Sequence, residues 1–388
     1  MPAIDHIRGF HDELTRIRRD IHANPEIGME EWRTSELVAE KLAAWGIEVH
    51  RNVGKTGVVG VLRVGNGART IGLRADMDAL PIVEANEFAH RSRHEGLMHA
   101  CGHDGHTTML LGAARYLAET RDFDGTVTFI FQPGEEGRGG ALAMLADGLF
   151  ERFPCETVFG MHNRPGMTIG RFGIAPGPYM AGAATFDIIV TGRGGHGAMP
   201  HHSVDPVLAA CHIGTALQSI VARNVPASAR AVLSVTRIAA GEAYNVIPET
   251  ATLAGTARAM TRETMTLLET AMKRLVPAIA AGFGATALVT FETMMTALVN
   301  SEAETDAIAA AATELVGEEH VNRANASVMG SEDFAFMLEK VAGAYIHLGN
   351  GDSRPVHNHR YDFNDAAIPY GAALYARLVE RQLAKGRS

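Results

Sequence analysis

The sequence predicts an α/β fold, a mixed sheet with helices on both faces, into which a smaller α+β unit is inserted. Three observations lead to this prediction. Short segments rich in β-branched residues alternate with helical segments at both ends of the chain, which is typical of an α/β sheet. Between them, the predicted elements follow the order β-α-β-β-α-β of a split βαβ unit. A length of 388 residues favours two domains.

The N-terminal part begins with two predicted helices. Apolar residues recur at three- and four-residue steps from Ile4 to Ile21, and this helix ends before Pro25. A second helix covers residues 30–45, with Gly46 in the position that follows a helix end. Strands are then expected over residues 58–64, 70–76 and 126–131, and a helix over residues 105–119.

The central part of the chain, which begins near residues 176–178, has a different pattern of predicted elements. A strand over 185–191 leads through a glycine-rich turn to a helix over 206–222, which Asp205 caps and Pro206 begins. Strands over 231–238 and 251–259, a helix over 262–280 and a strand over 286–292 complete the set. This order is ferredoxin-like. We expect an inserted domain over 181–294 and a larger domain made of 1–180 and 295–388.

Composition excludes several classes of protein. Apolar residues make up 46% and charged residues 20% of the chain, as in ordinary globular proteins. The net charge of −9 argues against nucleic acid and against an anionic membrane surface as partners. The uncharged stretch 275–291 contains Pro277 and is too short for a membrane span. Three cysteines cannot form a disulfide framework, and no signal-peptide core is visible, so we expect a cytoplasmic protein.

The densest cluster of potential metal-binding side chains follows Met98. Residues 99–106 contain three histidines and one cysteine. Cys101 and His103 are two residues apart, so an extended segment projects both side chains to the same side. Thiolate and imidazole suit zinc and similar metals. The alternative is that the histidines are polar residues at a helix start and that Cys101 is a small buried filler.

Other metal-binding residue types follow predicted strands. Glu135 and Glu136 come directly after the strand at 126–131, and His162 follows the apolar run 157–160. His357 and His359 follow a strand at 345–348. Neighbouring carboxylates point in different directions, so one can bind a metal while the other faces a substrate, although such a pair can also be an acidic helix start. Four segments of this kind favour a two-metal hydrolytic site.

The sequence resembles the M20 metallopeptidases, and within them the amidohydrolase branch of hippurate hydrolases, N-acyl-amino-acid deacylases and auxin-conjugate hydrolases. The resemblance rests on segments that occur in order from His22 to the C-terminal helix: RADMDALP (74–81), MHACGHDGHTTMLLGAA (98–114), FQPGEEG (131–137), GMHN (160–163), GRGGHGAMPH (192–201), NVIPE (245–249), GTAR (255–258), GSEDF (330–334) and HNHRYDFND (357–365). The family has a di-metal catalytic domain with an inserted ferredoxin-like lid or dimerisation domain, which agrees with the predicted organisation.

The resemblance implies a set of metal ligands and a general acid/base. The implied ligands are Cys101, His103, Glu136, His162 and His357, and the implied acid/base is Glu135. Most M20 peptidases have a His-x-Asp pair where this chain has Asp76-Met77-Asp78, so Cys101 and His103 supply metal ligation instead. We expect Asp76 and Asp78 to orient the ligands. His357 is preferred to His359 from the alignment of the motif.

The inserted domain carries the remaining candidates. His196 is either a solvent-facing turn histidine or, by resemblance, an oxyanion donor that reaches the partner subunit's site. Asn245 and Arg258 are either edge-strand polar residues or binders of a substrate α-carboxylate, for which an arginine fork is suited. Gly330 precedes a helix start at Ser331 and is expected to line the pocket through its backbone.

The resemblance therefore implies a metal-dependent amidohydrolase that cleaves N-acyl-amino acids into a carboxylic acid and an amino acid. Its implied cofactors are two divalent ions per subunit, zinc, manganese, cobalt or nickel, and its implied assembly is a homodimer or tetramer. No nucleophilic serine elbow is present in the sequence. Two alternatives are a metal-dependent dipeptidase or aminopeptidase and a catalytically silent ligand-binding homologue. Spacing alone does not define the acyl group.

Overall fold

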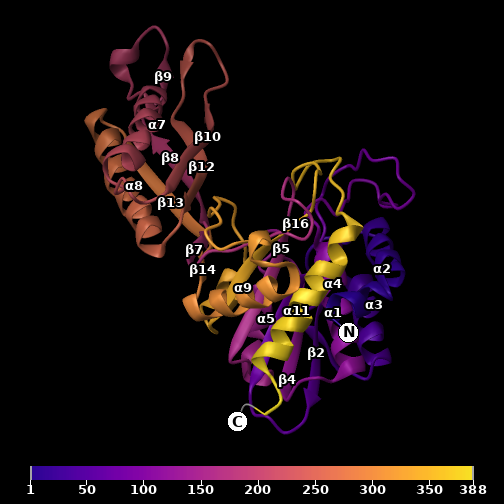
Figure 1. The fold of residues 1–388 in the computed structure, drawn as a ribbon. Helices are drawn as coiled ribbons and strands as arrows, with labels where there is room; N and C mark the ends of the chain where they lie inside the picture. Colours follow the sequence, from indigo (N-terminus) through magenta and orange to yellow (C-terminus); the bar gives the residue numbers. More distant parts are fainter. Residues whose placement is uncertain (1, 387–388) are drawn as a thin grey trace. The chain divides into compact units, whose positions relative to one another are not determined.

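The computed structural model describes residues 2–386, and the chain divides into two compact units (Figure 1). Unit 1 comprises Met1–Gly177, Val299–Ala326 and Phe336–Ser388, and unit 2 comprises Pro178–Leu298 and Ser327–Ala335. The segment 327–335, expected in the larger domain, belongs to unit 2 because its backbone bonds there. Val328 N donates to Tyr179 O (3.0 Å), and Ala181 N donates to Gly330 O (2.9 Å).

Unit 1 is built on an eight-stranded mixed sheet with the strand order β1-β2-β4-β3-β5-β16-β6-β15. The central strands β4, β3, β5 and β16 run parallel to one another, whereas β1 and β2 are antiparallel to their neighbours. Their bounds are β1 Glu48–Val53, β2 Gly57–Val64, β3 Thr70–Asp76, β4 Gly125–Gln132, β5 Thr157–Arg164, β6 Phe172–Gly173, β15 Val321–Asn322 and β16 Gly343–Gly349. Sequence analysis predicted β3 with these bounds and did not predict β1.

Helices cover the sheet of unit 1. The long helices α4 (His103–Thr120) and α11 (Ile368–Gln382) contact each other and β3, and α5 (Gly140–Ala146) contacts β4. One core of buried apolar residues joins the helices to the sheet, including Leu73, Phe129 and Leu374. The other helices are α1 Ala3–Arg8, α2 His11–Ala23, α3 Trp32–Ala44, α6 Leu149–Arg152, α9 Glu302–Val316 and α10 Ala335–Leu338, with short 3-10 turns η2 Glu318–His320 and η3 Asp365–Ala367.

Two helix boundaries differ from the predictions. The first helix, expected without interruption from Ile4 to Ile21, is broken into α1 and α2 at Gly9, whose residue type has low helix propensity. The helix expected at Ser331 begins only at Ala335, and Glu332 instead accepts a hydrogen bond from Phe334 N (3.0 Å). The expected end of α3 is confirmed, because Gly46 has a φ of +73° just beyond it.

Unit 2 contains a four-stranded antiparallel sheet of order β10-β12-β8-β13 and two helices. The elements follow the order β8 Gly182–Thr191, α7 Pro206–Arg223, β10 Ala231–Ala240, β12 Thr250–Ala259, α8 Arg262–Gly282 and β13 Thr286–Met295. This is the predicted β-α-β-β-α-β order. Asp205 caps α7, since its side chain accepts from Val207 N (2.8 Å) and Leu208 N (3.3 Å).

Short elements complete the chain: β7 Gly177–Met180, β9 Gly195–His196, η1 Pro200–His202, β11 Val246–Ile247 and β14 Leu298–Asn300.

In unit 2, residues on one side of β8 are buried against α7 and α8, including Phe186 and Ile188. Among residues 2–386, none of the helices is long and apolar enough to cross a lipid bilayer.

In unit 1, the parallel strands bring candidate site residues from distant parts of the sequence to one edge of the sheet. The carboxyl ends of β3, β4, β5 and β16 lie at this edge, where open α/β sheets place their functional groups. Asp76 is the last residue of β3, and Glu135 lies on the loop after β4. His162 lies near the carboxyl end of β5, and His357 lies on the loop after β16.

Candidate metal centre

Cys101 and His103 are held by the loop that leads into α4. Gly102, between them, has a φ of +100°, and a Cβ there would lie 2.3 Å from Asn163 Nδ2 and 2.5 Å from the Tyr361 hydroxyl. Only glycine therefore fits between the two candidate ligands. Both side chains are almost fully buried, with 7% and 1% of the residue exposed. The tight turn places thiol and imidazole in one cluster, as the Cys-x-His spacing predicted.

Asp78 orients two of the candidate ligands at once. Its Oδ1 lies 3.0 Å from His103 Nδ1, and its Oδ2 accepts a hydrogen bond from Glu136 N (3.0 Å). The Asp78 backbone oxygen is also 2.9 Å from His103 Nδ1. Because both contacts of Nδ1 are with oxygens, Nδ1 carries a proton, and in the neutral ring that binds a metal Nε2 would present a lone pair. His103 Nε2 is buried and has no hydrogen-bond partner within residues 2–386.

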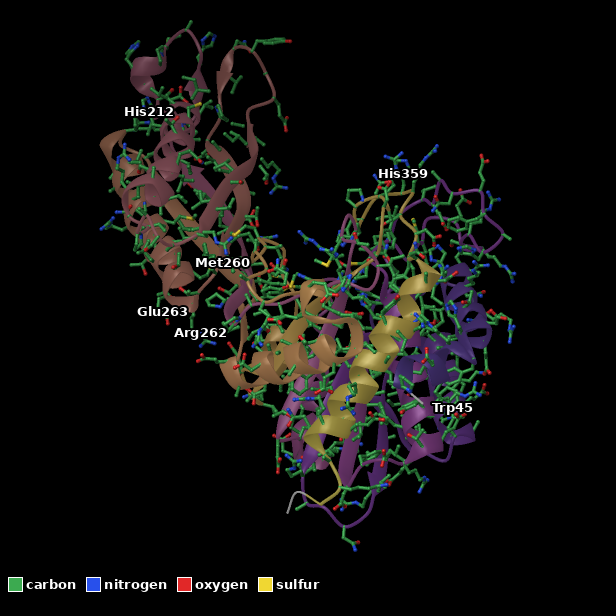
Figure 2. All side chains as sticks on the ribbon, viewed as in Figure 1. Trp45, His212, Met260, Arg262, Glu263 and His359 are labelled. Atoms are coloured by element: carbon green, nitrogen blue, oxygen red, sulfur yellow. The ribbon has the colours of Figure 1, made fainter. Side chains whose placement is uncertain are left out.

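His357 reaches the same cluster from the loop after β16. Its Nε2 lies 3.1 Å from Glu136 Oε1, and its backbone N–H donates to Ala100 O (2.7 Å). The residue has a φ of +65°, a left-handed conformation that non-glycine residues adopt rarely. His359, the alternative ligand, is exposed on the same loop (labelled in Figure 2), and its backbone oxygen accepts from Ala85 N (2.9 Å). Among residues 2–386, His357 and not His359 belongs to a group of side chains that could hold a metal ion.

His162 completes the arrangement from β5. Its Nε2 lies 3.4 Å from Cys101 Sγ, and its Nδ1 lies 2.7 Å from the backbone oxygen of Asn163. That second contact places the proton on Nδ1, so Nε2 faces the thiol as an acceptor. Burial together with the neighbouring His106 lowers the pKa of His162 well below its ordinary value. A neutral imidazole is the form that binds a metal.

Within unit 1, four overlapping groups of side chains could each hold a cation, because their ligand atoms lie within 4.8 Å of one another. Three consist of predicted residues: Cys101, His103 and His162; Cys101, Glu136 and His357; His103, Glu135 and Glu136. Thiol, imidazole and carboxylate form the donor set that zinc and its neighbours in the first transition row accept. Cys101 and Glu136 recur between groups, which is the pattern expected when two ions share ligands.

Electrostatics support this assignment. Burial and the adjacent Glu136 raise the pKa of the Cys101 thiol well above its ordinary value. A thiolate beside a carboxylate needs a compensating positive charge, which a divalent cation would supply. Together with the unpartnered nitrogen of His103, this shows that the residues fit a metal centre of borderline softness.

The fourth group, Asp76, His103 and His106, is better explained as support. His106 Nδ1 lies 2.6 Å from Asp76 Oδ1, and its Nε2 accepts from Asn163 N (3.0 Å), so both ring nitrogens are engaged. Asp76 also accepts from Arg74 Nη1 (2.7 Å). Although burial raises its pKa, the charges of His103 and Arg74 hold the pKa of Asp76 well below its ordinary value. Asp76 therefore fixes the helix start rather than offering a free oxygen.

These observations agree with a comparison of whole sequences. Residues 72–381 match the peptidase family M20/M25/M40, which is well over half of the chain. The chain belongs to this family. Among curated relatives, the M20 chain is 43% identical over 383 residues to hippurate hydrolase of Campylobacter jejuni, covering 99% of this chain and 100% of that protein. It is 36% identical over 374 residues to N-acetylcysteine deacetylase of Bacillus subtilis, covering 96% of this chain and 97% of that protein.

A solved structure gives the same result. A Bacillus subtilis protein described as a dinuclear metal binding peptidase from the M20 family has a TM-score of 0.86 and 32% sequence identity to this chain. The match covers 97% of this chain and 99% of that chain. The predicted family and its mixed α/β architecture are confirmed.

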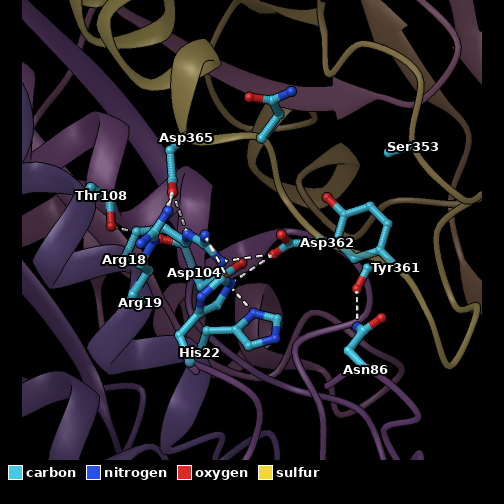
Figure 3. Close-up of polar contacts among 12 residues, drawn as sticks. Arg18, Arg19, His22, Asn86, Asp104, Thr108, Ser353, Tyr361, Asp362 and Asp365 are labelled. Atoms are coloured by element: carbon cyan, nitrogen blue, oxygen red, sulfur yellow. Dashed lines mark hydrogen bonds and ion pairs between the residues drawn. The ribbon is translucent and has the colours of Figure 1, made fainter. Parts of the chain in front are cut away.

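Sequence analysis missed a buried charge network that adjoins the candidate metal centre through Asp104 (Figure 3). Arg18 of α2 is fully buried and donates from Nη1 to Asp362 (3.0 Å) and from Nε to Asp365 (2.7 Å). The same Nη1 lies 3.4 Å from Asp104, the residue after His103. The network thus links the N-terminal helix, the start of α4 and the segment that follows His357. An amphipathic helix gives no sign in its sequence that one arginine turns inward.

His22 is part of this network. Its Nδ1 lies 2.8 Å from Asp104 Oδ2 and its Nε2 lies 3.2 Å from Glu84 Oε1. Burial lowers its pKa, but the two carboxylates outweigh burial and raise the pKa of His22 to about 9. His22 is therefore charged at neutral pH, and it compensates one of the buried carboxylates.

Within unit 2, the structure brings His196 and Asn245 together. β9 pairs with β11 so that His196 lies opposite Val246, and Gly197 N donates to Asn245 O (2.7 Å). Ala198 N donates to His196 Nδ1 (3.1 Å), which places the proton of the neutral ring on Nε2. Both side chains are exposed in this unit.

Arg258 and Gly330 lie elsewhere in unit 2. Arg258 is in β12, which has β10 and β8 on its two sides, so the edge-strand interpretation of this residue is wrong. Its guanidinium is half-buried, donates to Ala257 O (3.0 Å) and Thr256 Oγ1, and has a pKa lowered by burial. Gly330 is exposed, and its backbone oxygen is occupied by Ala181 N.

Proposed function

We propose that this protein is a metal-dependent amidohydrolase that cleaves the amide bond of N-acyl-amino acids, releasing a carboxylic acid and a free amino acid. The observation that carries the proposal is the cluster of Cys101, His103, Glu136, His162 and His357 beside Glu135, at the carboxyl ends of the parallel central strands of the mixed sheet. Membership of the M20 family and the names of its relatives, hippurate hydrolase and N-acetylcysteine deacetylase, support the same reaction.

Two divalent ions would be held by the five ligands, with Asp78 fixing the His103 ring and the Glu136 backbone. When bound, such ions polarise a carbonyl oxygen and lower the pKa of water towards neutrality. The thiol favours zinc, while imidazole and carboxylate also admit manganese, cobalt or nickel. Metal analysis of the purified protein, followed by reconstitution of chelated protein with each ion, distinguishes these possibilities.

Glu135 would move the proton during hydrolysis. It is 6% exposed, and its carboxylate lies in one group with His103 and Glu136. We assign it to accept a proton from the attacking water as the new C–O bond forms. It then delivers this proton to the amide nitrogen as the C–N bond breaks, because an amine anion is too poor a leaving group. The products are a carboxylate and an amine, and no redox change occurs.

Unit 2 would bind the remainder of the substrate. We assign Arg258 and Asn245 to the substrate α-carboxylate, because a guanidinium pairs with a carboxylate in bidentate geometry. Gly330 would contribute through its backbone. His196 would donate from Nε2 to the developing oxyanion in the partner subunit of a homodimer. Co-refolding of the inactive variants Glu135→Ala and His196→Ala tests this last assignment. Random pairing makes about half of the dimers mixed, each with one complete site, so the co-refolded sample should regain about a quarter of wild-type activity.

A substrate panel tests the proposal. N-benzoylglycine and N-acetyl-amino acids should be hydrolysed only by metal-loaded protein, and faster than free dipeptides of similar size. Preference for dipeptides would make the protein a dipeptidase. Failure to hydrolyse any linear amide with both ions bound would leave a ligand-binding homologue without catalytic activity.

A further inference from the structure

The segment that joins α2 to α3 contacts the loop of the general base. It covers residues 24–31 in unit 1. The α3 helix begins at Trp32, so Glu31 occupies the position before the first helical residue (Figure 1). Glu31 is nevertheless fully buried, and its side chain forms no bond to the helix.

Glu31 instead binds the turn that carries Glu135. Its Oε1 accepts a hydrogen bond from the backbone N–H of Gly134 (2.7 Å), and its Oε2 accepts from the Thr56 hydroxyl (2.5 Å). Gly134 immediately precedes Glu135 and is itself buried, with a φ of +56°. The bonded peptide is therefore one residue from the proposed acid/base and two residues from the proposed ligand Glu136.

A different carboxylate caps the helix. Glu26 accepts hydrogen bonds from Arg33 N (2.9 Å) and Thr34 N (2.8 Å), two of the donors that every helix start leaves without partners. Glu26 and Glu31 are thus two carboxylates of one short segment that each accept backbone N–H groups, one from the helix and one from the catalytic loop. Substitution of Glu26 is therefore a matched control for substitution of Glu31.

A close backbone approach holds the segment against the loop. A Cβ on Gly28 would lie 2.8 Å from Gly134 Cα and 3.1 Å from Asp78 Oδ2, so only glycine allows the contact. Ala79 N also donates to Glu26 O (2.8 Å). The segment therefore contacts both loops that carry site residues, the one after β3 and the one after β4, and Glu31 is the side chain that accepts the hydrogen bond from Gly134 N.

We propose that Glu31 is a positioning residue, which fixes the Gly134 peptide and thereby the direction in which Glu135 presents its carboxylate. This inference deepens the proposed function and rests on the assignment of Glu135 as acid/base. Misplacement of a reacting group by about 1 Å can reduce a rate about 100-fold, so one buried hydrogen bond to the adjacent peptide is sufficient for a large effect.

Burial raises the pKa of Glu31 to about 7, partly offset by the Thr56 bond. A protonated Glu31 can still accept from Gly134 N and would donate its O–H to the Thr56 hydroxyl oxygen, and an amide can make the same two contacts. In Glu31→Gln, the amide oxygen can accept from Gly134 N while the amide NH₂ donates to the Thr56 hydroxyl oxygen. In Glu31→Ala, both contacts are lost. The conservative variant thus distinguishes hydrogen-bond geometry from charge.

The experiment compares wild type with Glu31→Ala, Glu31→Gln and Glu26→Ala, each with measured metal content. With N-benzoylglycine we expect Glu31→Ala to lose about 10- to 100-fold in kcat at nearly unchanged KM and metal content. Glu31→Gln should stay within about threefold of wild type, and Glu26→Ala should keep wild-type kcat while losing stability. Wild-type kcat in Glu31→Ala, or an equal loss in Glu26→Ala, would overturn the proposal.

Amide hydrogen exchange of the metal-free proteins provides a readout independent of activity. Peptides covering residues 132–138 should exchange at least about tenfold faster in Glu31→Ala than in Glu26→Ala, while peptides from β3 change equally in both. Unchanged exchange at 132–138 would count against Glu31. If Glu31→Ala does not fold, Glu31→Asp, which withdraws the oxygen from Gly134, replaces it. If wild type hydrolyses no amide, the proposed function fails, while exchange still decides whether Glu31 fixes this loop.

Discussion

Asp78 offers the sharpest test of how the metal centre is held. Its two carboxylate oxygens face two donors, His103 Nδ1–H at 3.0 Å and Glu136 N–H at 3.0 Å. Asparagine at this position keeps the shape but supplies one acceptor oxygen and one NH₂ group, which is itself a donor. In Asp78→Asn, either His103 Nδ1–H or Glu136 N–H must therefore face the NH₂ group, which cannot accept its hydrogen bond.

The cost can be worked out from these contacts. Losing one charge-assisted hydrogen bond, with its buried partner left unsatisfied, costs about 1.5–3 kcal/mol. Since 1.4 kcal/mol corresponds to a factor of ten, metal affinity should fall about 10- to 150-fold. The backbone oxygen of Asp78 still accepts from His103 at 2.9 Å, which favours the lower part of this range. Changes at residues that orient metal ligands typically cost 10- to 100-fold.

Competition with a chromophoric chelator measures this affinity for zinc. Asp124→Asn is the matched control, because Asp124 also accepts two backbone N–H groups, from Asn66 (2.9 Å) and Gly67 (2.7 Å), at the opposite end of β4. We expect weaker binding in Asp78→Asn alone, with much of the activity restored by excess metal. Wild-type affinity in Asp78→Asn, or an equal loss in Asp124→Asn, would refute the reasoning.

Three further predictions concern single residues. Cys101→Ser should lower metal occupancy, with activity lost in proportion to metal lost, and a full complement of metal in the variant would exclude Cys101 as a ligand. Arg258→Ala should raise KM about 10-fold or more for substrates with a free α-carboxylate but not for their amides, and equal losses on both would indicate a purely structural role. In metal-free protein, the charged form of His22 stabilises the fold fully below pH 6.5, and this contribution is lost as pH rises through about 9. Wild type should therefore lose up to about 3 kcal/mol of unfolding free energy over that range relative to His22→Gln. Both tryptophans of the chain, Trp32 and Trp45 (the latter labelled in Figure 2), lie in unit 1, so their fluorescence reports the urea unfolding of this unit. Parallel pH profiles of the unfolding free energy of the two proteins would contradict the assignment.

Much of this architecture is visible in the sequence because local signals and tertiary structure agree. Runs of β-branched residues predicted the central strands, and Asp205 followed by Pro206 predicted the start of α7. The Cys-x-His spacing predicted a shared cluster from an extended backbone. The cluster forms, but the extended premise is wrong, because Gly102 makes a left-handed turn and His103 begins α4. Strand ends predicted where the carboxylates and histidines meet, since parallel strands end at one edge of a sheet.

The remaining features depend on contacts between distant segments. Arg18 looks like any charged residue of an amphipathic helix, yet it is buried with Asp104 and Asp362. Glu31 looks like a helix cap, yet it bonds to Gly134, 103 residues further along the chain. His106 belongs to the same histidine-rich motif as the predicted ligands, and only its contacts with Asp76 and Asn163 identify it as support. No local pattern specifies such long-range partners.

The most direct test of the central claim is hydrolysis of N-benzoylglycine by wild type and Glu135→Gln at equal, measured metal content. The amide is isosteric with the carboxylate and leaves Glu136 in place, but it cannot carry a proton. We predict two equivalents of divalent metal in both proteins and a kcat reduced about 100- to 10,000-fold in the variant. A fully metallated Glu135→Gln with near wild-type turnover, or equal activity of wild type after complete metal removal, would contradict the account.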